Sequence, residues 1–218
     1  MKEAGRHIAA VSAALEVLAA FDRDVPVRLK DLFERTGQNR SRLLRVLGTL
    51  EGYGFIRSNV EVGTYELGST IFRLGGLVHN PFSRMEEKIR PVLKRLVFQT
   101  SDTAFFSRIE GVHRIVLVAE ESPDTLRFTA REGQTRPLHV GATSEVLLAH
   151  ADNDTRERAF ELVAANDRAA LTEDLAAIAK RGFAVSHGEV TPHGFEISVP
   201  VRGPAGQIDA MSIAGVLS

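Results

Sequence analysis

The sequence predicts an α+β protein in two parts: a small, mostly helical part that ends in a hairpin, and a larger part of strands and helices. Three observations support this prediction. Apolar residues recur at helical spacing through the first fifty residues, two short strand patterns follow, and beyond Asn80-Pro81 alternating stretches are interleaved with helical ones. With 218 residues, 44% of them hydrophobic and 25% charged, the chain is long enough to build two cores of unequal size.

The first part is expected to contain three helices and a hairpin. The helices span 6–22, 30–36 and 40–52, a very short strand lies at 25–29, and the hairpin strands span 55–58 and 64–67. Gly37 separates the second helix from the third and suits a tight turn, because a positive φ carries no Cβ penalty in glycine. Asn39 or Ser41 would cap the third helix. Helix, turn, basic helix and hairpin is the order of a winged helix-turn-helix.

An arginine cluster indicates that the third helix binds DNA. Arg40, Arg42 and Arg45 lie close together, and no acid stands between Glu34 and Glu51. Arginine binds guanine or phosphate through two parallel hydrogen bonds, and a helix N-terminus favours phosphate. The predicted DNA-binding residues are Asn39, Arg40, Ser41, Arg42, Arg45 and, on the hairpin, Arg57.

Plainer interpretations stay open for these charges. A run of arginines on a helix is more often a solvated face than a nucleic-acid site. The hairpin also carries Glu61 and Glu66, so Arg57 is as readily an ordinary surface residue as a phosphate contact. The net charge of the chain is −1, so a DNA-binding surface on it must be a local one.

The second part is expected to be a sensor domain. Asn80-Pro81 stops a linker helix, so we place a winged helix-turn-helix domain at 1–68, the linker helix at 69–81 and the sensor domain at 82–218. Helices are expected at 83–100, 143–150, 154–166 and 172–181, and strands at 103–109, 115–120, 126–132, 183–186, 196–202 and 207–214. Phe105 and Phe106 should point to opposite faces of their strand, one into the core and one toward a helix.

The composition argues against catalysis and against a metal. The chain has no cysteine, which excludes disulfides, thiolate nucleophiles and cysteine zinc sites, and it has no Gly-x-Ser-x-Gly, P-loop or dinucleotide-binding glycine motif. We therefore expect neither enzyme activity nor a cofactor. His139, His187 and His193 would bind zinc only if they converged, and isolated histidines are more often structural or exposed, so no metal site is predicted.

The N-terminus superficially resembles a signal peptide, because Lys2 and Arg6 precede an apolar stretch. Glu3 and Glu16 are misplaced for that role, and the apolar residues repeat at helical spacing, which favours an amphipathic helix. No uncharged apolar run approaches the roughly 18–20 residues needed to span a bilayer. We therefore expect a soluble cytoplasmic protein with no membrane contact.

Several short sequence stretches, spread over nearly the whole chain, are informative because of the order in which they occur. They are LKDLFERTG at 29–37, TLE at 49–51, GFI at 54–56, YELG at 65–68, RPVL at 90–93, PLH at 137–139, KRGFAV at 180–185 and AMSIAG at 210–215. In this order they resemble the IclR family of bacterial transcriptional regulators. The resemblance implies a GAF-like effector-binding domain in the second part, a homodimer that often forms a dimer of dimers, and control by a small organic metabolite, commonly a carboxylate or an aromatic-pathway compound.

The predicted function is therefore a sequence-specific transcriptional regulator that binds a double-stranded DNA operator and responds to a small-molecule effector. The alternative is a protein-interaction or ligand-sensing module with a degenerate DNA-binding domain. Duplex binding that weakens steeply with salt distinguishes the first from the second.

By resemblance, the effector site gathers residues from one helix start and from the strands that follow it. They are His139, Gly141, Ala142, Thr143, His187, Glu196, Ser198, Ser212 and Ala214. Backbone N–H groups at this helix start could hold an anionic group. Three places depart from the family: Ala214 is often serine there, Glu196 is often small or cysteine, and 186–188 often contains an acid where this chain has Ser-His-Gly. An inward Glu196 would repel a carboxylate ligand unless something neutralises it, whereas a strand shifted by one residue would point it outward.

Overall fold

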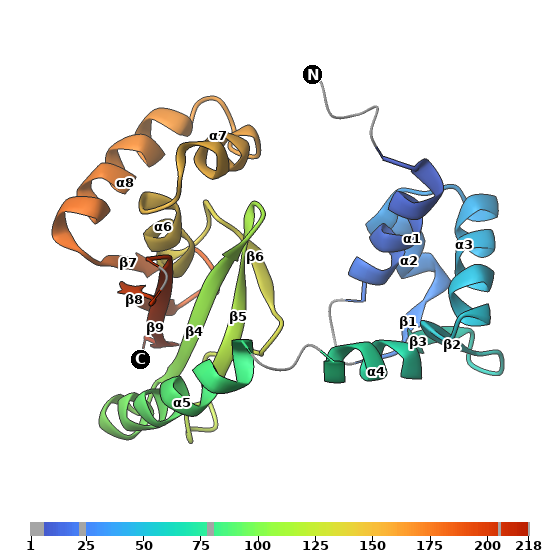
Figure 1. Ribbon diagram of the computed structural model, residues 1–218, viewed down its shortest axis with the longest axis horizontal. Helices are drawn as coiled ribbons and strands as arrows, with labels where there is room; N and C mark the ends of the chain where they lie inside the picture. The colour runs from blue at the N-terminus through green and yellow to red at the C-terminus, as the bar shows by residue number, and fades with distance from the viewer. Residues whose placement is uncertain (1–6, 22–24, 78–80, 205, 218) are drawn as a thin grey trace. The chain divides into compact units, whose positions relative to one another are not determined.

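The computed structural model describes residues 7–21, 25–77, 81–204 and 206–217, with backbone alone at 81–84. The chain divides into two compact units, Met1–His79 and Asn80–Ser218 (Figure 1).

The first unit is a helix-turn-helix followed by a hairpin. Its elements are α1 (Ala9–Ala19), β1 (Val27–Arg28), α2 (Leu29–Thr36), α3 (Arg40–Gly52), β2 (Ile56–Asn59), β3 (Thr64–Leu67) and α4 (Ser69–Leu77). The strands form an antiparallel sheet in the order β1-β3-β2. Buried Val17, Leu43 and Ile56 join α1, α3 and the sheet in one core. The predicted winged helix-turn-helix is confirmed. Its first helix is shorter than expected, since residues 7–8 and 20–21 are not helical, while residues 6 and 22 of the expected helix lie outside the described residues.

The turn between α2 and α3 has the geometry that its residues predict. Gly37 ends α2 with a φ of 62°, and its N–H donates to the carbonyl oxygen of Phe33 at 3.0 Å. Asn39, rather than Ser41, caps α3, because its side-chain oxygen accepts the backbone N–H of Arg42 at 2.9 Å.

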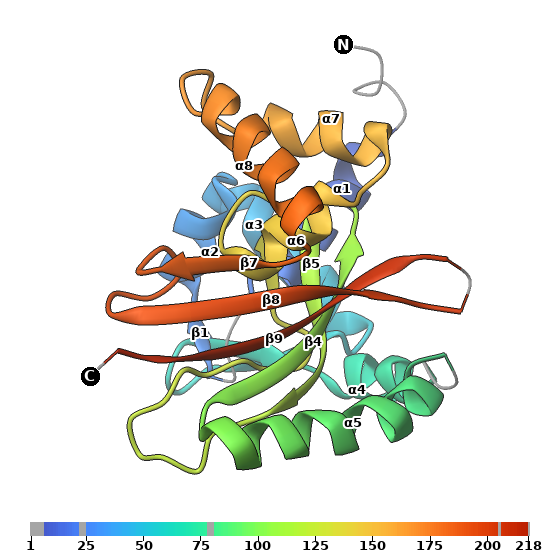
Figure 2. The ribbon, with the colours of Figure 1, turned by 90° about the vertical axis from the view of Figure 1, so that its left-hand side faces the viewer.

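The second unit is built on one antiparallel sheet of six strands. Its elements are α5 (Pro81–Thr100), β4 (Thr103–Glu110), β5 (His113–Glu120), β6 (Thr135–Pro137), α6 (Ala142–Ala149), α7 (Asn153–Glu161), α8 (Arg168–Arg181), β7 (Ala184–His187), β8 (Gly194–Arg202) and β9 (Ile208–Val216). The strand order is β6-β5-β4-β9-β8-β7. Figure 2 shows α5 along one face and α6 on the other, with α7 and α8 beyond α6. The predicted α+β class is confirmed.

Each face of this sheet has its own core. Leu93 of α5 packs with Phe106 and Val118 on one face. Phe105 points to the other face, where it packs with Val116 and Phe128. The expected alternation of Phe105 and Phe106 is therefore confirmed.

The expected strand at 126–132 is wrong. Apolar and polar residues alternate at 126–132, but the segment is a loop. Phe128 is buried against Phe105 with ring centroids 6.2 Å apart, while Leu126 is exposed. The hydroxyl of Thr103 donates to the carbonyl oxygen of Phe128 at 2.6 Å, so a side chain binds the backbone where a ladder was expected. The strand at this edge is β6, a few residues later.

Two helix limits also differ from the expected ones. α7 ends at Glu161 instead of continuing to 166, and α8 begins at Arg168 instead of 172.

Candidate DNA-binding helix and effector site

One face of α3 is exposed and basic. Arg40, Ser41 and Arg45 are exposed on it, whereas Leu43 and Leu47 on the opposite side are buried. This separation follows from the 3.6-residue helical period, which leaves positions 41, 45 and 48 on one side. α3 can therefore present two arginines and a hydroxyl to a groove of DNA without disturbing its core.

Arg42 belongs to a different contact. Its Nη2 donates to the carbonyl oxygen of Ala9 at 2.6 Å, so the half-buried side chain joins α3 to the start of α1. Arg42 was predicted to contact DNA, but in this structure it is held against protein.

Gln38 is a positioning residue that the sequence analysis did not identify. Its buried side chain donates through Nε2 to the carbonyl oxygen of Ala13 and to Oε2 of Glu16, both at 3.0 Å. These bonds fix the turn before α3 against α1. The signal available in the sequence was an amide side chain directly after the turn glycine.

Arg57 on the hairpin is already paired. Its Nη2 lies 2.5 Å from Oε2 of Glu66, the residue opposite it across β2 and β3. Glu66 therefore offsets the positive charge that was predicted to meet a phosphate. Of the two interpretations left open, the structure favours an ordinary surface pair.

The start of α6 holds an anion supplied by the protein itself. Gly141 precedes the helix with a φ of 85°. The backbone N–H of Thr143 donates to Oε1 of Glu196 at 2.6 Å, and that of Ala142 donates to Oγ of Ser186 at 3.3 Å. The N–H groups expected to bind an anionic ligand are therefore occupied by side chains of β7 and β8.

Buried hydroxyls continue this polar cluster across the sheet. Oγ1 of Thr143 and Oγ of Ser212 lie 2.6 Å apart, and Oγ of Ser212 donates to Oγ of Ser198 at 2.9 Å. Ala214 lies opposite Glu196 in the β8–β9 ladder and packs in the core beside Phe105. The structure thus brings these predicted residues to one place, beneath α6.

Glu196 points inward, with 1% of its surface exposed, so the outward alternative is wrong. Arg114 of β5 faces it: Nη2 of Arg114 lies 3.9 Å from Oε2 of Glu196, and the guanidinium lies over the ring of Phe105 at 5.3 Å. Its Nη1 donates to Oγ of Ser107 at 3.4 Å. Burial lowers the pKa of Arg114 and the charge of Glu196 opposes this shift. Arg114 is the neutralising group that the sequence analysis lacked.

The three histidines considered above as effector or zinc ligands differ in how far they are exposed. His139 is half-buried, two residues before Gly141, and its Nδ1 is buried with no hydrogen-bond partner among the described residues. The prediction for His187 is wrong by one residue, because strand alternation turns His187 to solvent and Ser186 toward α6. His193 is exposed with a φ of 61°. Within the described ranges, no three histidine or acidic side chains are grouped as a metal site requires.

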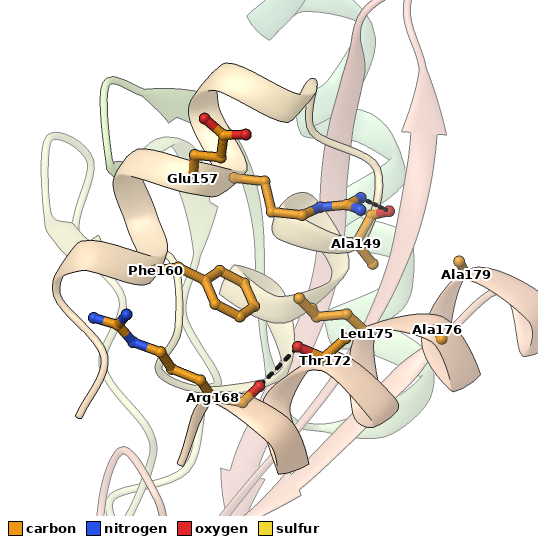
Figure 3. Close-up of a pocket in the computed structure, with 9 residues that line it drawn as sticks. Ala149, Glu157, Phe160, Arg168, Thr172, Leu175, Ala176 and Ala179 are labelled. Carbon is orange, nitrogen blue, oxygen red and sulfur yellow. Dashed lines mark hydrogen bonds between the residues drawn. The ribbon is translucent and has the colours of Figure 1, made fainter. Parts of the chain in front are cut away.

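A cleft of about 540 Å³ lies between α7 and α8, lined by none of the predicted effector residues (Figure 3). Phe160 and Leu175 contribute apolar side chains to its lining. Its two arginines are committed to carbonyl oxygens: Nη2 of Arg156 donates to Ala149 at 3.0 Å, and Nε of Arg168 donates to Val163 at 3.1 Å. We assign this cleft no ligand.

Two protein-family models match the chain. The IclR helix-turn-helix domain matches residues 10–59, and the bacterial transcriptional regulator IclR C-terminal domain matches residues 83–218. The chain belongs to the IclR family.

Individual relatives agree with this family. The HTH-type transcriptional regulator BhcR of Paracoccus denitrificans is 30% identical over 217 residues, which cover 95% of this chain and 77% of that protein. The crystal structure of an IclR regulator from Alicyclobacillus acidocaldarius superposes with a TM-score of 0.74 and 26% identity, covering 96% of this chain and 88% of that one. An IclR homolog from Microbacterium hydrocarbonoxydans complexed with 4-hydroxybenzoate superposes with a TM-score of 0.73 and 21% identity, covering 96% and 90%.

The curated IclR relatives are named as transcriptional regulators or repressors. The chain is therefore a DNA-binding transcriptional regulator and not an enzyme. None of the helices in the described ranges has the length and apolar character needed to cross a membrane.

The effector domain of this IclR protein should lose stability as pH rises, because of Glu145 in the first turn of α6. Burial raises the pKa of Glu145 to about 7, helped by Glu189 and Asp174 and opposed by Arg181. The ordinary value is 4.5, so the folded state holds this proton more tightly than the unfolded state. Its stabilising effect is complete below pH 4.5 and is lost as the pH rises through about 7.

Glu145→Gln should remove this dependence. Urea unfolding of both proteins at about pH 5 and pH 8 should show the wild type losing on the order of 1–2 kcal/mol relative to the variant at the higher pH. Glu157→Gln, at an exposed acid of α7, serves as the control and should follow the wild type. Identical pH dependence for wild type and Glu145→Gln would contradict the assignment.

Proposed function

We propose that α3 binds an operator in the major groove through Arg40, Ser41 and Arg45. The observation that carries this proposal is the exposed basic face of α3, whose arginines have no ion pair among the described residues. Asn39 can add its amide N–H2, because capping uses only its oxygen. Arg42 and Arg57 would have to leave their present partners before they could bind DNA.

We also propose a homodimer, which can pair into a dimer of dimers. Two copies of α3 related by a two-fold axis would bind two half-sites of one operator. Exposed apolar residues on the first unit support self-association, among them Val11 and Leu15 on α1 and Phe72 on α4. The proposed division is a DNA-binding domain at 1–68, a linker at 69–81 that contains α4, and an effector-binding domain at 82–218.

The proposed effector site is the buried polar cluster beneath α6. Its residues are Gly141, Ala142, Thr143, Glu196, Ser198, Ser212 and Ala214, with His139 at its edge. The relative described as complexed with 4-hydroxybenzoate supports control by a small organic molecule. Because such a regulator acts on the chromosome, we assign the protein to the bacterial cytoplasm.

Fluorescence anisotropy with the DNA flanking the protein's own gene tests this function. We expect saturable binding that is tighter than to an unrelated duplex of equal length. A dimer that neutralises at least four phosphates should lose affinity with a log–log salt slope of about −3.5 or steeper. If no duplex binds, even at low salt, the alternative of an interaction module with a degenerate DNA-binding domain replaces the proposal.

A further inference from the structure

Four buried polar atoms, on two predicted effector residues and on two arginines of the paired strands β5 and β6, have no hydrogen-bond partner among the described residues. Within the described residues, Nε of Arg114, Nε of Arg136, Nδ1 of His139 and Oε2 of Glu196 are all buried and unpaired. Buried polar groups in native proteins are almost always hydrogen-bonded, to protein, water or ligand. These atoms therefore have the capacity to bind a polar molecule.

The two arginines give this place a surplus of positive charge. Arg114 and Arg136 are directly opposite each other across β5 and β6, so their side chains share one face of the sheet. Arg136 also lowers the pKa of Arg114, as a nearby like charge does. Glu196 supplies one carboxylate against two guanidinium groups. Glu145 is near enough for Glu196 to raise its pKa, but with a pKa of about 7 it adds only part of a second negative charge, so the remaining positive charge favours an anion.

Glu196 places a second requirement on a ligand, which is a hydrogen-bond donor. Its Oε1 is used by the N–H of Thr143, whereas Oε2 lies 3.9 Å from Nη2 of Arg114. A hydrogen-bonded pair of these groups would be about 2.7–2.9 Å apart. Oε2 is therefore an acceptor that a ligand with a hydrogen-bond donor can use.

We infer that the effector is a 2-hydroxy acid, whose carboxylate binds Arg114 and Arg136 and whose hydroxyl donates to Oε2 of Glu196. This inference rests on the proposed effector site. A 2-oxo acid has no donor and would direct its oxygen lone pairs at the carboxylate of Glu196. A 2-amino acid has a donor that can pair with Glu196, but it carries no net charge, so it leaves the remaining positive charge of the two arginines unbalanced, whereas a 2-hydroxy acid neutralises it.

Three acids of equal size test the inference: lactate, pyruvate and alanine differ only in the group on the carbon next to the carboxylate. Isothermal titration of the full chain should show lactate, in one of its two enantiomers, binding at least about tenfold more tightly than pyruvate or alanine, the difference expected for one hydrogen bond to a charged group.

Glu196→Gln should reverse this preference. The new amide can keep the bond from Thr143 through its oxygen and offers N–H2 in place of Oε2, so it should favour pyruvate over lactate. Arg136→Met should weaken both acids to a similar extent. Glu157→Gln, in the cleft between α7 and α8, is the control and should bind as the wild type does.

Pyruvate or alanine binding as tightly as lactate, or an unchanged preference in Glu196→Gln, would overturn the inference. So would binding of none of these acids by a preparation that still binds operator DNA, which leaves the DNA-binding function intact. Loss of operator binding by the wild type counts against the proposed function instead, because the titrations with acids do not depend on DNA.

Discussion

Arg45→Ala should weaken operator binding by about 10- to 100-fold, the usual effect of losing one arginine contact to a base. Arg45 is exposed on the outer face of α3, and no helix or strand of its own unit covers it. Its removal should therefore leave folding unchanged. Anisotropy titrations give the affinity, and urea unfolding of the same preparations gives the stability.

Arg42→Ala is the matched control, because it removes the same side chain one turn earlier on the same helix. It should cost about 1 kcal/mol of stability through the lost bond to Ala9, with a smaller effect on the operator. Equal operator affinities for Arg45→Ala and the wild type would remove α3 from its assigned role. An operator effect larger for Arg42→Ala would mean that Arg42 leaves Ala9 to bind DNA.

Asp209→Ala should destabilise the second unit by about 2–4 kcal/mol. Asp209 is 2% exposed on β9 and accepts Nε and Nη2 of Arg108 at 2.6 and 2.8 Å. This two-bond pair joins β9 to β4 across the centre of the sheet. Its loss leaves a half-buried guanidinium without its anion.

Asp154→Ala is the comparison, because Asp154 forms an exposed pair with Arg158 on α7 at 3.7 Å. Exposed pairs contribute little, so this variant should unfold at nearly the wild-type urea concentration. Changing both members of the buried pair, with Arg108→Met and Asp209→Leu, should recover much of the lost stability. If Asp209→Ala and Asp154→Ala unfold at the same urea concentration, the pair of Arg108 and Asp209 does not stabilise the sheet.

The helix-turn-helix could be predicted closely, since its signals are local. Gly37 and Asn39 set the turn and the cap within a few residues of the elements they separate. The role of Arg42 could not be predicted in this way, because its partner lies 33 residues away in sequence. Periodicity assigns a side chain to a face, but a distant carbonyl decides whether that side chain is free.

Part of the proposed effector site could be predicted from the sequence. Family resemblance pointed to the α6 start and to the inner faces of β8 and β9, and of these residues Ser212 and Ala214 stand within one of the motifs. Arg114 belongs to none of the motifs and was missed. It lies two residues before Val116 in β5, so both side chains point to the same buried face of the strand. The error at 126–132 has a related origin: Phe128 has the pattern of a strand residue but is held by a side chain of β4.

Gly141 limits how this protein can acquire a new ligand preference. Any side chain there would begin 2.6 Å from Cγ2 of Val190 and would need a backbone with φ near 85°, which other residues rarely adopt. Substitutions at Gly141 are therefore not available as small steps toward a new ligand preference. Natural variants that respond to other molecules should differ first at sheet positions such as 114, 196 and 212, where a side chain can change without moving the backbone.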